Sequence, residues 1–133
     1  MSKLRVVLAG LGVRGRHWAE VLVRSPRCEI VAYVDPNPAA HERMKAHYGE
    51  RSGYASAEEA LVAVSDVGAL VLANPPIGRE GQIRAAAERG IPMLVEKPLA
   101  LDVAEAAHLV SIAIFSAGLF LYWKLSRPDA RRA

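Results

Sequence analysis

The chain has 133 residues, enough for one domain with a hydrophobic core of ordinary size. Hydrophobic residues make up 52% and charged residues 23%, and this balance excludes a disordered chain, a collagen or a coiled coil. The net charge is only +3, with much of the excess at the carboxyl end, so we expect no nucleic-acid partner. The single cysteine, Cys28, excludes a disulfide within one chain and a cysteine-ligated zinc site, and we expect no bound metal.

The first half of the chain alternates short apolar runs with helical patterns. Residues 4–9 form an apolar, β-branched run that a glycine ends, which is typical of a buried strand. A helical pattern follows and continues to Ser25, where the next residue, Pro26, ends it. A second buried strand is predicted at residues 29–34, and a turn with two prolines leads into a helix that ends at Gly49.

The second half repeats this alternation. Ser56 and Glu59 have the spacing of a capping box, which predicts a helix that begins there, after a short strand at residues 53–54. The other predicted elements are strands at residues 67–73, 92–95 and 119–123, and helices at residues 79–89 and 103–117.

Strands that alternate with helices and are apolar on both faces are typical of a parallel sheet buried between two helix layers. The sequence therefore predicts an α/β fold of three layers: a doubly wound parallel sheet of the Rossmann type, with strand order 3-2-1-4-5-6. We expect this domain to cover residues 1–123, followed by a basic tail over residues 124–133.

The uncharged stretch at residues 109–123 resembles a membrane anchor because a basic tail follows it. It is shorter than the roughly 20 apolar residues of a spanning helix, and Glu105 and His108 precede it. Gly118 also divides it. We therefore favour a buried helix, turn and strand over insertion into a membrane.

The sequence GLGVRG after the first predicted strand is a G-x-G-x-x-G motif, and a helical pattern follows it. This is the context that a dinucleotide-binding loop needs. Gly10 would allow the tight turn, Gly12 would let a pyrophosphate approach the backbone, and Gly15 would let the helix pack closely. The helix N-terminus favours a phosphate beside Val13 and Arg14. A plain turn between strand and helix is the alternative.

Asp35 ends the second predicted strand, 25 residues after Gly10, near the position where an acid binds the ribose hydroxyls of an adenosine. Its charge would repel a 2′-phosphate, so NAD is favoured over NADP as the cofactor. Arg14 and Arg16 keep NADP open, since either could pair with such a phosphate. Asp35 could also serve only as a cap for the turn that follows it.

Four segments together resemble the N-terminal domain of the glucose–fructose oxidoreductase, inositol dehydrogenase and rhizopine catabolism (Gfo/Idh/MocA) family. They are GLGVRGRHW, IVAYVDPNPAAHERMKAHYG, VEKPLALDVAEA and the strand end with Asn74, Pro75 and Pro76. They occur in the family's order and spacing and cover most of residues 4–113. The tail resembles the family's sixth strand and the start of its second domain more loosely.

The resemblance implies roles for the matching positions. The three glycines of the loop would hold the pyrophosphate, Asp35 the adenosine ribose, and the Asn-Pro-Pro segment would line the nicotinamide side. Glu96 would touch the nicotinamide ribose. Lys97 would orient the substrate hydroxyl and help to move its proton, and a cis bond between Lys97 and Pro98, common in the family, would aim Lys97 into the site.

The sequence departs from the family pattern in two places. A histidine often follows the Pro-Pro pair in the family, and Ile77, Gly78 and Arg79 stand there instead. The family's second domain, which supplies the substrate pocket, a sheet for oligomerisation and usually an Asp and a His for proton transfer, is missing from the 133 residues. Residues 124–133 would be the stub of that substrate domain.

We therefore expect the NAD(P)-binding domain of a cytoplasmic oxidoreductase that transfers a hydride between a nicotinamide cofactor and a sugar, cyclitol or similar polyol. By itself the chain would lack a complete catalytic site. The alternative is a stand-alone nucleotide-binding or regulatory module without catalysis. An open apolar edge at the end of the sheet also predicts a homo-oligomer through the C-terminal segment, residues 112–123.

Overall fold

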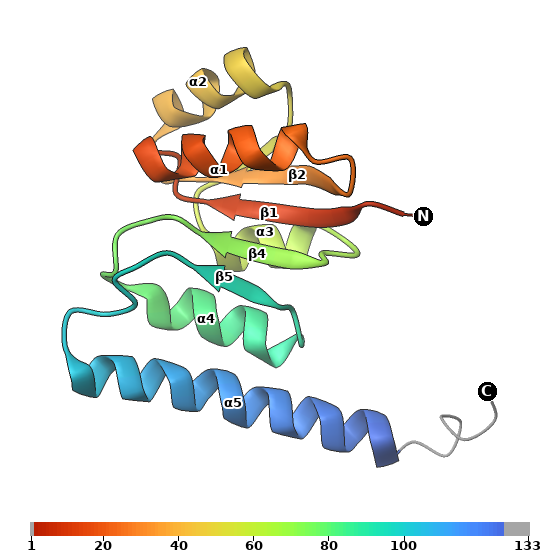
Figure 1. Ribbon diagram of the computed structural model, residues 1–133, viewed down its shortest axis with the longest axis vertical. Helices are drawn as coiled ribbons and strands as arrows, with labels where there is room; N and C mark the ends of the chain where they lie inside the picture. Colours follow the sequence, from red (N-terminus) through yellow and green to blue (C-terminus); the bar gives the residue numbers. More distant parts are fainter. Residues whose placement is uncertain (1, 127–133) are drawn as a thin grey trace.

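The computed structural model describes residues 2–126, and side chains as far as residue 114. Five parallel strands form one sheet in the order β3-β2-β1-β4-β5, with helices on both faces (Figure 1). The strands are β1 (Leu4–Ala9), β2 (Cys28–Val34), β3 (Ser52–Tyr54), β4 (Ala69–Leu72) and β5 (Met93–Val95). The helices are α1 (Val13–Arg24), α2 (Pro38–Tyr48), α3 (Ala57–Ala63), α4 (Arg79–Glu88) and α5 (Val103–Ser126). The predicted doubly wound α/β fold is confirmed, as is the order of its first five strands.

Two hydrophobic clusters cover the two faces of the sheet. One contains Leu8 of β1, Leu22 of α1 and Met44 of α2. The other contains Val7 of β1 and Ile83 of α4, together with buried residues of α3 and α5. Because successive side chains of a strand point to opposite faces, a strand buried on both faces must be apolar at nearly every position. This is why the central strands appear in the sequence as mostly apolar runs, with charged residues only near their first positions.

Parallel pairing brings the carboxyl ends of the central strands to one edge of the sheet. Ala9 of β1 is in register with Val34 of β2 and with Leu72 of β4. The pairing continues one residue further, since the N–H of Gly10 donates to the oxygen of Val34 over 2.8 Å. The N–H of Ala73 likewise donates to the oxygen of Ala9 over 2.7 Å. The segments that follow these strands are therefore neighbours in space.

Polar side chains fix the start of two helices. The hydroxyl of Ser56 accepts a hydrogen bond from the N–H of Glu59 over 3.2 Å, and the Glu59 carboxylate accepts one from the N–H of Ala55 over 3.3 Å. This reciprocal pair confirms the predicted capping box of α3. At α2 the side chain of Asn37 accepts from the N–H of Ala39 over 3.0 Å, a cap that sequence analysis did not single out.

The predicted sixth strand is wrong. Residues 119–123 belong to α5, so the described residues contain no strand after β5. Gly118 does not end the helix, because a glycine inside a helix costs only about 1 kcal/mol relative to alanine. A short apolar run is also compatible with both a strand and a helix, and its type cannot be read from periodicity alone. The predicted end of the domain falls inside α5, and most of the predicted basic tail lies outside the described residues.

The uncharged stretch at residues 109–123 lies wholly within α5. Among the helices that the structure describes, none combines the length and the apolar character needed to cross a membrane.

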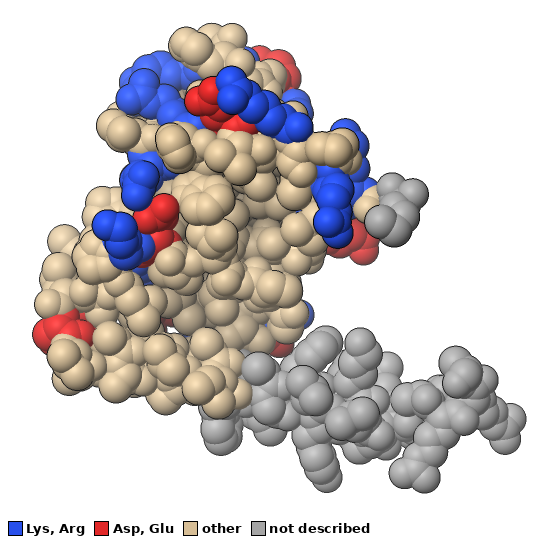
Figure 2. Space-filling model, viewed as in Figure 1, with Lys and Arg blue, Asp and Glu red and all other residues tan. Residues whose placement is uncertain are grey.

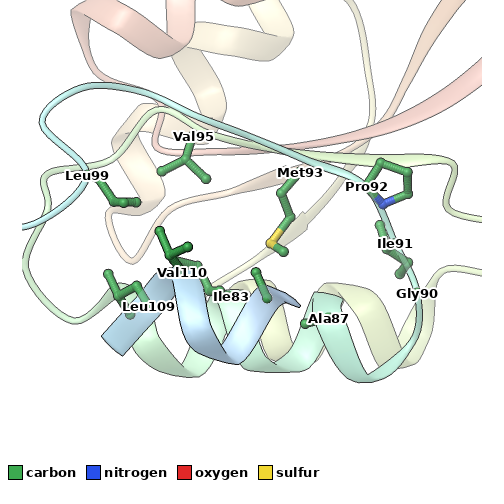
Figure 3. Close-up of a pocket in the computed structure, with 11 residues that line it drawn as sticks. Ile83, Ala87, Gly90, Ile91, Pro92, Met93, Val95, Leu99, Leu109 and Val110 are labelled. Carbon is green, nitrogen blue, oxygen red and sulfur yellow. The ribbon is translucent and has the colours of Figure 1, made fainter. Parts of the chain in front are cut away.

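An apolar groove of about 520 Å³ lies beside the edge strand β5, between α4 and α5; we call it the β5 groove (Figure 3). Met93 and Val95 of β5, Ile83 of α4, and Leu109 and Val110 of α5 line it, and none of its lining residues is charged. Charged side chains gather instead around α1 and α2, in the upper part of the face seen in Figure 2. The surface beside β5 is therefore apolar, whereas the surface around α1 and α2 is charged.

Candidate dinucleotide-binding site

A cleft of about 830 Å³ lies among the segments that follow β1, β2, β4 and β5. All predicted site residues line it except Gly15, which is buried below the loop: Gly10, Gly12, Val13, Arg14, Asp35, Asn74, Pro75, Pro76, Glu96 and Lys97. In doubly wound sheets the crevice at the carboxyl ends of the strands is the usual place for a ligand. The fold therefore brings the dispersed sequence motifs together in one place.

The three glycines of the loop differ in what surrounds them. A Cβ on Gly10 would overlap the backbone of Asn74, and one on Gly15 would overlap the carbonyl oxygen of Gly10. Gly10 also has a φ of +88°, in the left-handed region that favours glycine. A Cβ on Gly12, by contrast, has no neighbouring atom within 4 Å. The fold itself requires glycine at positions 10 and 15, whereas Gly12 only leaves space open in the cleft.

The N-terminus of α1 presents free backbone N–H groups beside that space. The amide of Arg16 makes a helical bond to the oxygen of Gly12 over 3.0 Å. The preceding amides have no acceptor within the helix. Gly12, the N-cap, has no side chain to cap them, and the first turn contains no acid. The uncapped N–H groups and the positive end of the helix dipole suit an anionic group such as a pyrophosphate.

Asp35 follows β2 at the opposite side of the glycine loop. One carboxylate oxygen accepts a hydrogen bond from the N–H of Leu11 over 2.9 Å, and the other accepts one from the N–H of Asn37 over 2.8 Å. Asp35 thus caps the turn that follows it and also anchors the loop. Each oxygen keeps further acceptor capacity, so the same carboxylate can also receive hydroxyl groups of a ligand.

Asn74 follows β4 and contributes an amide to the cleft. Its Nδ2 donates to Oε1 of Gln82 over 3.2 Å. Its Oδ1 is buried and has no hydrogen-bond partner among the described residues. A buried acceptor without a partner costs free energy, and a donor on a ligand would remove that cost.

Glu96 follows β5 and is held from two directions. Its Oε1 accepts a hydrogen bond from the indole N–H of Trp18 over 2.9 Å, and its Oε2 lies 3.7 Å from Nε of Arg14. The Trp18 hydrogen bond, more than the charges of Arg14 and Lys97, holds the pKa of the Glu96 carboxyl below its ordinary value. The side chain is therefore ionised at neutral pH and fixed in direction.

Lys97 is exposed and lines the cleft next to Glu96. The peptide bond between Lys97 and Pro98 is cis, as the resemblance implies. Lys97 is the one lysine among the lining residues of the cleft.

Arg79 was not among the site residues expected from the sequence. Its guanidinium is buried, with 1% of the residue exposed, and it donates to the backbone oxygens of Glu96, Pro98, Leu99 and Asn74. Burial lowers the pKa of Arg79, while the nearby Glu96 carboxylate opposes that effect. The only signal in the sequence was an arginine in the stretch where the family often has a histidine.

The described residues contain no group of three or more His, Cys, Asp or Glu side chains that could hold a metal ion.

Comparison with known proteins gives consistent matches. A family model described as an oxidoreductase family with an NAD-binding Rossmann fold matches residues 4–119. Inositol 2-dehydrogenase 4 of Saccharopolyspora erythraea is 35% identical over 113 residues, which are 84% of this chain and 33% of that protein. The chain therefore spans about a third of the length of this relative.

Solved structures agree with the family match. GenD2 from gentamicin A biosynthesis, in complex with NAD, has a TM-score of 0.77 and 29% identity, over 87% of this chain and 33% of that one. Scyllo-inositol dehydrogenase from Lactobacillus casei, with bound NAD(H) and scyllo-inositol, has a TM-score of 0.78 and 20% identity, over 88% of this chain and 34% of that one. At that identity the second likeness shows the fold alone.

Proposed function

Because the chain belongs to the Gfo/Idh/MocA oxidoreductase family, we propose that it is the cofactor domain of an enzyme that transfers a hydride between a nicotinamide dinucleotide and a sugar, cyclitol or similar polyol. One observation carries the proposal: the glycine loop, Asp35, the Asn-Pro-Pro segment, Glu96 and Lys97 line a single cleft. Titration of NADH into the purified chain tests it, and saturable binding is the expected result.

The pyrophosphate would lie over Gly12, against the N-terminus of α1. The open space at the Cβ position of Gly12 and the free amides of the helix support this placement. Because Gly10 and Gly15 are already crowded by the protein's own backbone, they would shape the loop without needing to touch the ligand.

Asp35 would accept the hydroxyls of the adenosine ribose, which favours NAD over NADP. A 2′-phosphate beside this carboxylate would be repelled. Arg14, which would be one candidate partner for such a phosphate, has its Nε 3.7 Å from Glu96, beside a different part of the cleft. This engagement further supports NAD, while NADP remains the weaker ligand in the proposal.

The nicotinamide half would lie between the Asn-Pro-Pro segment and the Glu96 loop. When bound, the nicotinamide ring supplies or takes up the hydride, and the protein holds and orients the partners. Glu96 would accept hydroxyls of the nicotinamide ribose. Lys97 Nζ would contact the substrate oxygen, orient the hydroxyl and help to move its proton as the alcohol becomes a carbonyl. The named inositol dehydrogenases among the relatives support a cyclitol as the substrate class.

The substrate pocket and the remaining proton-transfer groups would come from a second domain, since the chain spans about a third of its relatives. A second copy of the chain would pack against the β5 edge and α5. Two features support this partner: among the described strands β5 pairs with β4 alone, and the groove beside it is lined by apolar residues. A cytoplasmic location completes the proposal, because nicotinamide dinucleotides are cofactors of intracellular metabolism.

A further inference from the structure

Arg79 is the single polar or charged residue that is buried in the described part of the chain. A buried cation is normally paired with a carboxylate, because removing a charge from water is costly. Among the described residues no carboxylate oxygen forms an ion pair with the Arg79 guanidinium. Backbone carbonyl oxygens accept hydrogen bonds from both Nη atoms instead, while the buried Nε has no hydrogen-bond partner among the described residues. This buried charge therefore holds backbone in place through its two Nη atoms.

The four carbonyl groups belong to two different loops. Nη1 of Arg79 donates to the oxygens of Glu96 and Pro98, each over 2.7 Å, and to that of Leu99 over 3.3 Å. Nη2 donates to the oxygen of Asn74. One loop follows β4 and the other follows β5, and these strands are neighbours in the sheet. A single side chain therefore ties together the two loops that line one end of the cleft.

Lys97 lies between two of these acceptors. The carbonyl before it, of Glu96, and the carbonyl after it, of Pro98, both bond to the same guanidinium nitrogen. The buried Arg79 guanidinium thus fixes the backbone on both sides of Lys97, although the Lys97 side chain itself is exposed.

We propose that Arg79 is a positioning residue that sets the place of Glu96 and Lys97 relative to Asn74. In this role Arg79 strengthens the binding of the nicotinamide half of the dinucleotide and leaves the binding of the adenosine half unchanged. The inference rests on the proposed function. A guanidinium is planar and offers five donors in a fixed arrangement, so it can serve several carbonyl groups at once. A lysine has three donors on one nitrogen and no such fork. The guanidinium also keeps its charge throughout the accessible pH range.

The other half of the cleft does not depend on Arg79. Gly10, Gly12 and Asp35 are held by the β1–β2 pairing and by the hydrogen bonds of Asp35 to Leu11 and Asn37. ADP, which carries the adenosine and the pyrophosphate but no nicotinamide, would contact only this half. Comparing NADH with ADP therefore separates local positioning from a general loss of structure.

The test is titration of NADH and of ADP into the wild-type chain and into Arg79→Met, Arg79→Lys and Arg84→Met. Arg84 is the matched control, since it lies on the same helix but is half exposed and pairs with Glu80 over 2.7 Å. We expect Arg79→Met to weaken NADH binding by about tenfold or more and Arg79→Lys by about threefold or more. The affinity for ADP should change by less than about twofold in both Arg79 variants. Arg84→Met should change the affinity for neither NADH nor ADP.

Circular dichroism and thermal unfolding establish which variants are folded, and Arg79→Lys carries the test if Arg79→Met does not fold. A folded Arg79 variant that binds NADH as tightly as the wild type would overturn the inference. A folded variant whose affinities for NADH and for ADP fall to the same extent would also overturn it, because Arg79 would then be purely structural. Failure of the wild-type chain to bind NADH would instead count against the proposed function.

Discussion

The indole N–H of Trp18 donates a hydrogen bond over 2.9 Å to the carboxylate of Glu96, a residue 78 positions away in the sequence. Trp18 belongs to α1, which begins at the glycine loop, and Glu96 follows β5. The bond therefore joins the glycine-loop side of the cleft to the side formed by the loop after β5. It fixes the direction of Glu96 and, together with Arg14, favours the ionised carboxylate.

Trp18→Phe removes this N–H and keeps an aromatic ring. We expect its unfolding temperature to lie a few degrees below that of the wild type at pH 7. Because the bond lowers the pKa of Glu96, its stabilising effect is present above the ordinary carboxyl pKa of 4.5 and is lost as the pH falls through the folded value. The difference in unfolding temperature between the two proteins should therefore shrink as the pH falls below the ordinary carboxyl pKa of 4.5.

Glu96→Gln provides the control for this experiment, since it removes the titrating group. In that background, Trp18→Phe should lower the unfolding temperature by an amount that does not vary with pH. If the unfolding temperatures of the wild type and Trp18→Phe differ by the same amount at neutral and at acidic pH, Trp18 acts through packing alone.

Gly12→Val should abolish dinucleotide binding in a folded protein. The added side chain enters space that is empty in the protein and that a pyrophosphate would need in the proposed binding mode. The backbone at Gly12, with φ of −75°, is open to any residue. Gly15→Ala is the contrasting variant, because its methyl group would overlap the oxygen of Gly10 and should cost about 1–3 kcal/mol of stability. Calorimetric titration and thermal unfolding measure both effects, and normal NADH binding by a folded Gly12→Val would refute the loop assignment.

The isolated chain should bind cofactor but show no measurable turnover of simple polyols. Lys97 is the only residue of the cleft to which we assign proton transfer, and the groups that would complete the site are expected from a second domain. Absorbance of NADH at saturating cofactor measures turnover. Robust activity that disappears in Lys97→Ala would contradict this prediction and would mean that a neighbouring copy completes the site.

Self-association should occur through the β5 groove and α5. Val110 of α5 lines the groove and is 45% exposed, so a charge there would disfavour packing of a second copy without entering the core. Light scattering over a range of concentrations should show a dimer or larger assembly for the wild type and a monomer for Val110→Glu. A wild type that is monomeric at every concentration would contradict the prediction.

Most of the fold could be predicted because its signals are local. Apolar runs of strand length, the capping box at Ser56 and the glycine loop each report on a few neighbouring residues. The alternation of strands and helices then fixes the order of the parallel sheet. The prediction of a sixth strand was wrong because it too relied on a local signal. Residues 119–123 are apolar and aromatic, and nothing within that short run distinguishes a strand from the continuation of a helix.

The residues that line the candidate cleft could be named from the sequence, while the contacts that support them could not. Positions such as Gly12, Asp35 and Lys97 lie within recognisable motifs. Arg79 and Trp18 do not, because their roles come from hydrogen bonds to segments that are distant in the sequence. Trp18 belongs to α1, and only the packing of α1 against the loop after β5 shows that its indole N–H has a partner.

The most direct test of the account is a parallel titration of NADH and NADPH into the wild-type chain and into Asp35→Ser. The account predicts saturable binding of both ligands to the wild type, with NADH tighter by about tenfold, because the Asp35 carboxylate accepts ribose hydroxyls and repels a 2′-phosphate. In Asp35→Ser the preference should narrow or reverse. Tighter binding of NADPH by the wild type would show that a basic residue outweighs Asp35, and absence of binding of either ligand to the folded chain would contradict the central claim.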